Sequence, residues 1–199
     1  MIGAVSQAVA VEAPAEQSQR LVPLSYLVFP ALSLAILFVA ILVNGTWLLD
    51  GLHVFYGALW TGVDLFAGFV VGPVLRKLDP PVRKAFMQRY MPRMLVIMPT
   101  LATITLAAAW QLARKDGFLT MPYPRHWWLV ATFVIVGVMA TVAFAVMLPS
   151  NLQVLFEMRK AAPNGALIGA LTSRYATFAG VLGVMQIGTI IVMSRLATF

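Results

Sequence analysis

The chain has 199 residues, of which 61% are hydrophobic and only 11% charged, and its mean hydropathy is +0.88. These values lie outside the range of soluble globular domains and predict an integral membrane protein. The net charge of +7 is carried by basic residues between apolar segments, so we expect these residues to face lipid headgroups and not nucleic acid. Cysteine is absent, which excludes disulfides, thiolate metal sites and covalently attached haem.

Five apolar segments are long enough to cross a bilayer, which requires about 20 residues. We therefore predict an all-α, polytopic bundle of five transmembrane helices at about 24–43, 52–75, 94–113, 127–147 and 175–196. A bundle of four helices is the alternative if the first segment is peripheral. Residues 1–20 show no basic region before an apolar run, so we interpret them as a flexible tail that precedes a transmembrane domain of residues 21–199.

Basic residues are distributed unequally between the two sides of the predicted bundle. Ten fall on one side, namely Arg20, the six between positions 76 and 93, Arg159, Lys160 and Arg174, and four fall on the other, namely Arg114, Lys115, Arg125 and Arg195. The positive-inside rule then predicts a cytoplasmic N-terminus and an outside C-terminus in a prokaryotic inner (plasma) membrane. With this topology, both histidines of the chain, His53 and His126, lie at similar depth near the outer interface.

The second apolar segment contains an aspartate close to its middle. His53, Gly57, Trp60 and Asp64 fall within one stripe of a helix, with Asp64 about 16 Å deeper in the membrane than His53. This stripe should face other helices or a cofactor and not lipid. Because a central aspartate costs about 2.5 to 3.5 kcal/mol to insert, we predict that Asp64 is a catalytic carboxylate that accepts a proton or binds a cation.

A structural role for Asp64 is an equally weighted alternative. A protonated carboxyl would then bond to a polar group on a neighbouring helix, and the candidates are Thr100, Thr103 and Thr105 in the third segment and Gln186 and Thr189 in the fifth. No lysine or arginine falls in the middle of a predicted span, which makes a buried ion pair improbable and excludes a retinal Schiff base.

The two histidines are candidate metal or haem ligands, because neutral imidazole is the commonest ligand of this kind. His53 and His126 come from different helices at one depth, as a b-type haem requires. Gly57 and Gly62, on either side of Trp60, would let the macrocycle approach the backbone, and Arg125 could pair with a propionate. The alternative is a histidine that is only hydrogen-bonded at the interface, and we favour it for His126 because Trp127 and Trp128 follow directly.

Two further patterns concern helix packing. Met87, Met91, Met94 and Met98 share one helical face; thioethers bind Cu(I), but adaptable packing is the favoured interpretation.

Gly68-x-x-x-Gly72 predicts close helix contact, with Ala176-x-x-x-Gly180 in the fifth segment as its partner. Gly72-Pro73 is expected to end or kink the second helix.

The motif His53-x6-Trp60-x-Gly62 resembles the first conserved helix of the CopD-type copper-resistance proteins. It is also similar to the HemJ-type protoporphyrinogen oxidases, which are small helical membrane proteins that bind b-type haem. The resemblance covers residues 52–113, about two helices and their connection. It implies a helical membrane fold, with His53 in the position of a haem ligand.

These observations lead to three functional hypotheses. The first is a membrane redox protein that binds one b-type haem with His53 as a ligand and His126 as the candidate second ligand, and with Asp64 coupling electron transfer to proton transfer. The second is a protein that transports or handles copper or another cation through Asp64, His53 and the methionine face. The third is a structural subunit of a larger membrane complex or homo-oligomer, in which the polar stripe meets a partner helix.

Overall fold

The structure, a computed structural model, describes residues 23–198, and over this range its regular elements are all helices. Five helices are long and apolar enough to cross a membrane, so the prediction of an all-α bundle with five candidate spans is confirmed. Their bounds are Leu24–Leu42, Thr46–Lys77, Pro80–Lys115, His126–Met158 and Gly165–Ala197. The predicted tail at residues 1–20 lies outside the described residues.

Two of the five spans contain a π-helical turn. The first span joins the 3-10 turn η1 (Leu24–Leu27) to α1 (Val28–Leu42), and the third and fifth are α4 (Pro80–Lys115) and α7 (Gly165–Ala197). In the second, α2 (Thr46–Phe66) passes through the π-helical turn η2 (Ala67–Val71) into α3 (Gly72–Lys77). In the fourth, α5 (His126–Val142) passes through a second π-helical turn, η4 (Ala143–Met147), into α6 (Leu148–Met158). A 3-10 turn, η3 (Phe118–Thr120), precedes α5.

The helices extend well beyond the predicted spans. Residues 80–93, which the sequence suggested were a basic connection, form the beginning of α4. At 1.5 Å per residue this helix is about 54 Å long, whereas the hydrocarbon core is about 30 Å thick. Apolar content marks only the part of a helix that lies in lipid, and a helix can continue beyond it into water.

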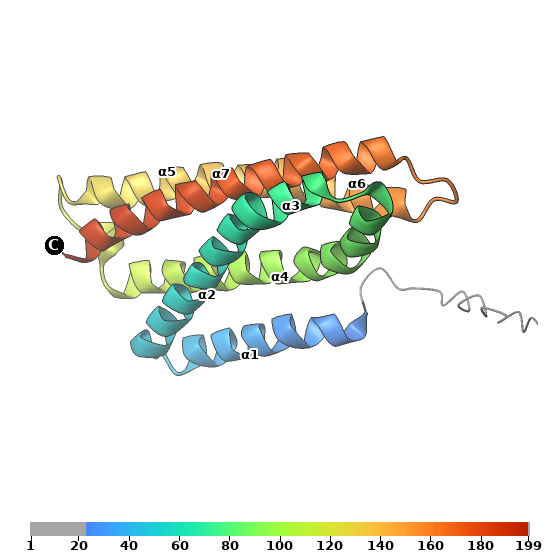
Figure 1. Cartoon of the computed structure of the whole chain (residues 1–199). Helices are drawn as coiled ribbons and strands as arrows, with labels where there is room; N and C mark the ends of the chain where they lie inside the picture. The colour runs from blue at the N-terminus through green and yellow to red at the C-terminus, as the bar shows by residue number, and fades with distance from the viewer. Residues whose placement is uncertain (1–22, 199) are drawn as a thin grey trace, which may run out of the picture.

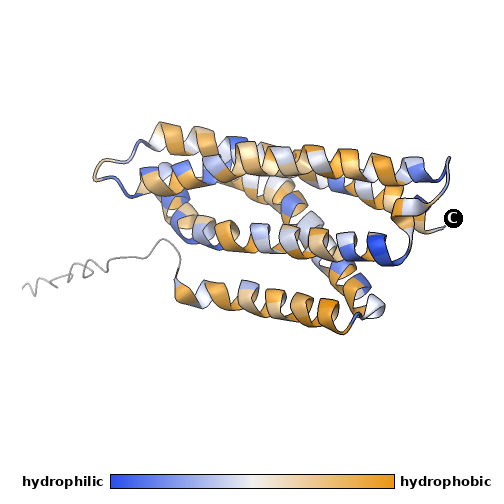
Figure 2. Ribbon diagram, turned by 180° about the vertical axis from the view of Figure 1, so that it is seen from behind, coloured by the Kyte–Doolittle hydropathy of each residue, from blue (hydrophilic) through white to orange (hydrophobic). Residues whose placement is uncertain are grey.

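The helices run in alternate directions, so each end of the bundle gathers alternate connections (Figure 1). We call the end with the α3–α4 and α6–α7 connections the basic end, because nine of the described lysines and arginines lie at or near it. The other end, with the α1–α2 and α4–α5 connections, is called the opposite end. Figure 2 shows hydrophobic residues along the helices and hydrophilic ones concentrated at the two ends.

α2 is the helix that connects the parts of the bundle. It begins beside α1, crosses α4 and reaches α7 through η2 and α3 (Figure 1). α7 also packs against α5 and α6, while α1 packs against α2 and α4. The outer helix α1 is attached by a buried hydrogen bond in which the Tyr56 hydroxyl donates to Ser33 Oγ at 2.7 Å.

Glycines allow α2–η2 and α7 to approach each other closely. A Cβ added at Gly68 would lie 2.3 Å from the Cα of Gly180, and one added at Gly72 would lie 2.7 Å from the Cβ of Ala176. The predicted pairing of the two small-residue motifs is therefore confirmed. In lipid, where no hydrophobic force joins helices, such backbone contact is a main source of association.

Both π-helical turns stand directly before a proline. η2 ends two residues before Pro73, and η4 ends two residues before Pro149. Proline lacks an N–H and its ring clashes with the carbonyl four residues earlier, and a widened turn accommodates both effects. Gly72-Pro73 therefore distorts the second helix but does not end it, since α3 continues to Lys77.

The glycine contact predicts a difference between two substitutions in one helix. Gly68→Ala places a methyl group against the backbone of α7 and should destabilise the fold by about 1 to 3 kcal/mol. Gly62→Ala is the matched control, because an added Cβ there meets no atom within 4 Å, and it should be neutral or stabilising by up to about 1 kcal/mol. Thermal unfolding in detergent, followed by helical circular dichroism, measures both; equal melting temperatures would contradict the packing contact.

Candidate functional site

Asp64 lies in the last turns of α2 and is completely buried, with an exposed fraction of 0%. Its Oδ2 accepts a hydrogen bond of 2.8 Å from Nε2 of Gln186 on α7. Of the five partners that the sequence suggested, Gln186 is thus confirmed. The hydroxyls of Thr100, Thr105 and Thr189 bond instead to carbonyls one turn earlier in their own helices.

The environment of Asp64 contains no compensating charge. Among residues 23–198, Asp64 forms no ion pair. The ion pair that the structure shows in this range joins Lys160 to Glu157, near the connection to α7. Its second oxygen, Oδ1, has no hydrogen-bond partner in the described part of the chain, and the same holds for Oε1 of Gln186. The carboxyl group is therefore held by one bond and has room for a second.

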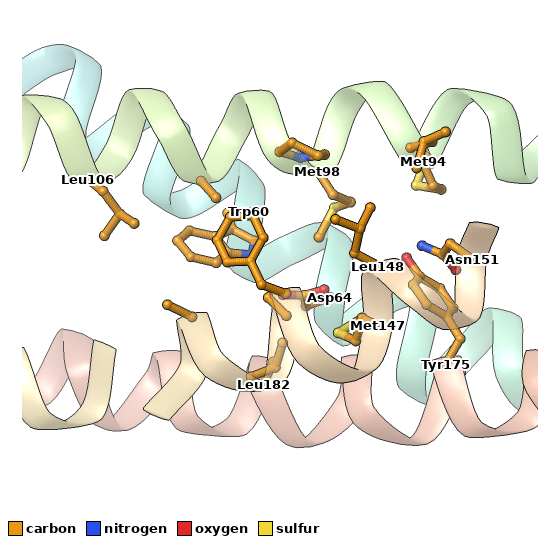
Figure 3. A pocket seen from close by; sticks show the side chains of 16 residues that line it. Trp60, Asp64, Met94, Met98, Leu106, Met147, Leu148, Asn151, Tyr175 and Leu182 are labelled. Atoms are coloured by element: carbon orange, nitrogen blue, oxygen red, sulfur yellow. The ribbon is translucent and has the colours of Figure 1, made fainter. Parts of the chain in front are cut away.

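A small cavity lies beside Asp64 in the middle of the bundle (Figure 3). Its volume is about 70 Å³, which is room for a few water molecules at roughly 10 to 15 Å³ each. Small-molecule sites usually measure about 300 Å³ or more. The wall is mainly apolar, and the side chains named in Figure 3 are Trp60, Asp64, Met94, Met98, Leu106, Met147, Leu148, Asn151, Tyr175 and Leu182.

Three of the side chains around this cavity present buried polar atoms without a partner in the described residues. These atoms are Oδ1 of Asp64, Oδ1 of Asn151 and the hydroxyl of Tyr175. Asn151 and Tyr175 are 6% and 3% exposed, so bulk water does not reach them. Each unsatisfied buried group costs about 1 to 3 kcal/mol. Their convergence on one water-sized space indicates a hydrated polar site within an apolar bundle.

The distorted fourth helix builds one wall of the site. Ala143, Phe144 and Met147 of η4 line the cavity, and Leu148 and Asn151 follow them in α6. Asp64 itself lies just before the other π-helical turn, η2. π-Helical turns occur frequently at functional sites because they re-aim side chains out of the regular helical register.

The predicted stripe on α2 does face protein. Trp60, one turn before Asp64, is buried and lines the cavity. His53 is half-buried, and its Nδ1 lies 3.0 Å from the carbonyl oxygen of Thr105 on α4. Since a carbonyl only accepts, Nδ1 carries the hydrogen and Nε2 is the nitrogen with a lone pair. Histidines that ligate metals commonly use this arrangement.

His126 has different surroundings. It begins α5 with Arg125 as the preceding cap residue, both half-buried, and its ring centroid lies 5.0 Å from that of Tyr123. α2 and α5 begin at the same end of the bundle, as expected, but α2 begins beside α1 and α5 begins near the end of α7 (Figure 1). His53 contacts α4, whereas His126 contacts Tyr123 in the connection that precedes α5.

The two predicted haem-contact glycines do not share a cavity. A Cβ added at Gly57 would lie 3.4 Å from the methyl group of Thr105, so α2 and α4 are in contact there. Gly62 has no atom within 4 Å of an added Cβ and lies on an open side of α2. These contacts leave no space for a porphyrin at Gly57, so the residues do not fit a haem inserted between α2 and α4.

The methionine face points into the bundle. Met87 and Met91 are completely buried, and Met94 and Met98 line the cavity beside Asp64, opposite Met147 of η4. Met87 and Met91 contribute to the hydrophobic core, in agreement with the packing interpretation. Met147 was not singled out in the sequence because it belongs to another helix.

Asn151 and Tyr175 are the site residues that the sequence did not reveal. Asn151 was assigned to a connection and Tyr175 to the beginning of the fifth span. A buried asparagine two residues after Pro149 would be the available signal, but only if the helix is known to continue past the proline. Contact between α6, α7 and α2 is a tertiary property.

Comparison with known proteins gives one partial match to a family model and no activity. A family model described as a domain of unknown function (DUF4149) matches residues 55–150. The match begins two residues after His53, includes Trp60 and Asp64, and ends one residue before Asn151. No curated protein and no solved structure matches the chain.

Proposed function

We propose that this protein translocates protons, and that Asp64 binds and releases the proton in the middle of the membrane. The observation that carries this proposal is the state of the Asp64 carboxyl group. It is fully buried, has no cationic partner in the described residues, and lies beside a cavity of the size of a few waters.

Burying a carboxylate without a counter-ion costs free energy, and protonation removes that cost without requiring room for a larger ion. Gln186 can serve both protonation states, because its amide has donor and acceptor atoms. Its Nε2 donates to Oδ2 of Asp64, and its Oε1 is free to accept from a proton on the carboxyl group. A proton on the carboxyl group thus gives a hydrogen-bond partner both to Oδ1 of Asp64 and to Oε1 of Gln186, neither of which has one in the described residues.

Ligand chemistry favours a proton over a larger cation. Hard cations such as Ca²⁺ take six to eight oxygen ligands, whereas Asp64, Asn151 and Tyr175 supply the side-chain oxygens at this cavity. Within residues 23–198 no group of three or more histidine, aspartate or glutamate side chains is placed to hold a metal ion. Copper is the alternative transported ion, because thioethers bind Cu(I) and those of Met94, Met98 and Met147 surround the same cavity.

The redox hypothesis is supported by one observation, the Nδ1–H of His53, which leaves Nε2 available as a ligand atom. The packing at Gly57 argues against a haem between α2 and α4, so we derive no step through such a group. A subunit role, in a homo-oligomer or a larger complex, is the third candidate, with Asp64 then serving assembly.

We further propose that the basic end faces the cytoplasm of a prokaryotic cell and that the C-terminus is outside. Nine described basic residues lie at or near that end and four at the opposite end, which supports this orientation through the positive-inside rule.

The translocation proposal predicts that Asp64→Asn abolishes proton flux. Asparagine keeps the shape and the hydrogen-bonding capacity of the side chain but cannot bind a proton. In liposomes with an imposed potassium diffusion potential, an enclosed pH dye should report a rate at least ten times below wild type. Asp50→Asn, on the exposed surface of the same helix, is the control and should leave the flux unchanged. Wild-type flux in Asp64→Asn would contradict the proposal, and failed folding or assembly of this variant would favour the subunit role.

The redox alternative predicts a different result in an absorption spectrum. Protein purified in mild detergent would show a Soret band that His53→Ala removes, while His126→Ala tests the second ligand. Oxidised and dithionite-reduced spectra of the three proteins measure this. A colourless and fully inserted wild type would contradict the redox alternative.

The orientation predicts the labelling of single cysteines, which the natural chain lacks. Asp79→Cys lies in the α3–α4 connection and Asp116→Cys directly follows α4 at the opposite end. A membrane-impermeant maleimide added to intact cells should label Asp116→Cys and not Asp79→Cys. The reverse pattern would show that the protein is inserted with the other orientation.

A further inference from the structure

The polar groups around the cavity lie on one side of Asp64. Tyr175 precedes Gln186 by eleven residues in α7, which places it about 16 Å nearer to the basic end. Asn151 lies in α6, beyond the η4 turn and towards the same end. In Figure 3 the side chains of Asn151 and Tyr175 lie on the Met94 side of Asp64, and the Tyr175 hydroxyl points into the cavity.

A second tyrosine continues this series towards the surface. Tyr90 of α4 has its hydroxyl near that of Tyr175, and no direct hydrogen bond joins the two hydroxyls in the described residues. Unlike Tyr175, Tyr90 is partly exposed, and its ring stacks on Phe86 at 5.3 Å between centroids. Tyr90 comes two residues before Pro92, in the part of α4 that leads to the basic end.

Among the described residues that line the cavity, those on the other side of Asp64 include no group that can relay a proton. The lining residues there include the apolar Leu106, Ala140 and Leu182. Trp60 can donate a hydrogen bond through its indole N–H, but this nitrogen has no lone pair with which to accept a proton. In Figure 3 Leu106 and Trp60 stand on the side of Asp64 away from Asn151 and Tyr175. Among the residues that line the cavity, Asp64 and Tyr175 are the titratable ones, and none is a lysine, arginine or histidine.

We infer that Asp64 exchanges protons with the aqueous phase at the basic end, through Tyr175 and Tyr90, and not with the opposite end in this conformation. The inference rests on the proposed proton-binding role of Asp64. It assigns to both tyrosines a relay function, and it makes the structure the state of a translocation cycle that is open to the basic end.

The relay balances without forming a charged tyrosine. A proton from water at the basic end bonds to the Tyr90 oxygen as Tyr90 gives its hydroxyl proton to a water between the two tyrosines, and this water passes a proton to the Tyr175 oxygen. Tyr175 in turn gives its own proton to a water in the cavity, and this water passes a proton to Asp64. One aqueous proton is consumed and one O–H bond forms on the carboxylate. Hydroxyl groups are suited to this transfer because each is donor and acceptor at once.

Isotope exchange at Asp64 tests the route. Wild type in lipid nanodiscs is moved from H₂O to D₂O, and the shift of the carboxyl C=O infrared band is followed with time, with Asp64→Asn identifying the band. Tyr175→Phe and Tyr90→Phe remove only a hydroxyl and should each slow the exchange at least tenfold. Tyr56→Phe is the matched control, because the Tyr56 hydroxyl bonds to Ser33 of α1 and lies off the route. It should exchange at the wild-type rate.

The outcomes separate the inference from the function on which it depends. If wild type shows no band that Asp64→Asn removes at any pH, Asp64 does not hold a proton and the proposed function fails. If the band is present and both tyrosine variants exchange as fast as wild type, the relay is wrong while the proton-binding role stands. Slowing in Tyr56→Phe equal to that in the other variants would also overturn the relay, because the effect would then be a general loosening of the bundle.

Discussion

The contact between α2–η2 and α7 is the constraint on which the rest of this structure depends. Gly68 and Gly180 bring the two backbones together, and one turn away Asp64 meets Gln186 across the same interface. Lipid offers no hydrophobic gain for helix association, so close packing and interhelical hydrogen bonds must supply it. The same interface therefore stabilises the bundle and buries the one carboxyl group in the middle of a span.

The cavity beside Asp64 follows from this close contact and from the prolines. α2 crosses the bundle to reach α7, and the π-helical turn before Pro149 re-aims the side chains of the fourth helix around the remaining space. Asn151 and Tyr175 are thereby buried with polar atoms that have no partner in the described residues. An apolar filling would have been more stable, since each such atom carries a cost, and this is the physical reason for assigning the cavity a function.

The histidines have different surroundings from Asp64. His53 fixes the start of α2 to α4 through a backbone carbonyl, while His126 packs against Tyr123 where α5 begins. α2 and α5 begin at the same end of the bundle but beside different helices (Figure 1). Similar depth in the membrane is not sufficient for two histidines to ligate one haem, because they must also lie close together in the plane of the membrane.

Much of the fold was predictable from the amino-acid sequence alone. Apolar length determined five membrane-spanning helices, a charge in the middle of a span marked Asp64, and the small-residue spacing identified both Gly68 and Gly180 as contact points. Gln186 was one of five candidates, and only the structure selected it. The tertiary structure also decided the full length of α4, the partners of the two histidines, and the presence of Asn151 and Tyr175 beside Asp64. Hydropathy and periodicity describe one helix at a time, whereas a polar site within a membrane forms where several helices meet, and that depends on crossing angles set by packing.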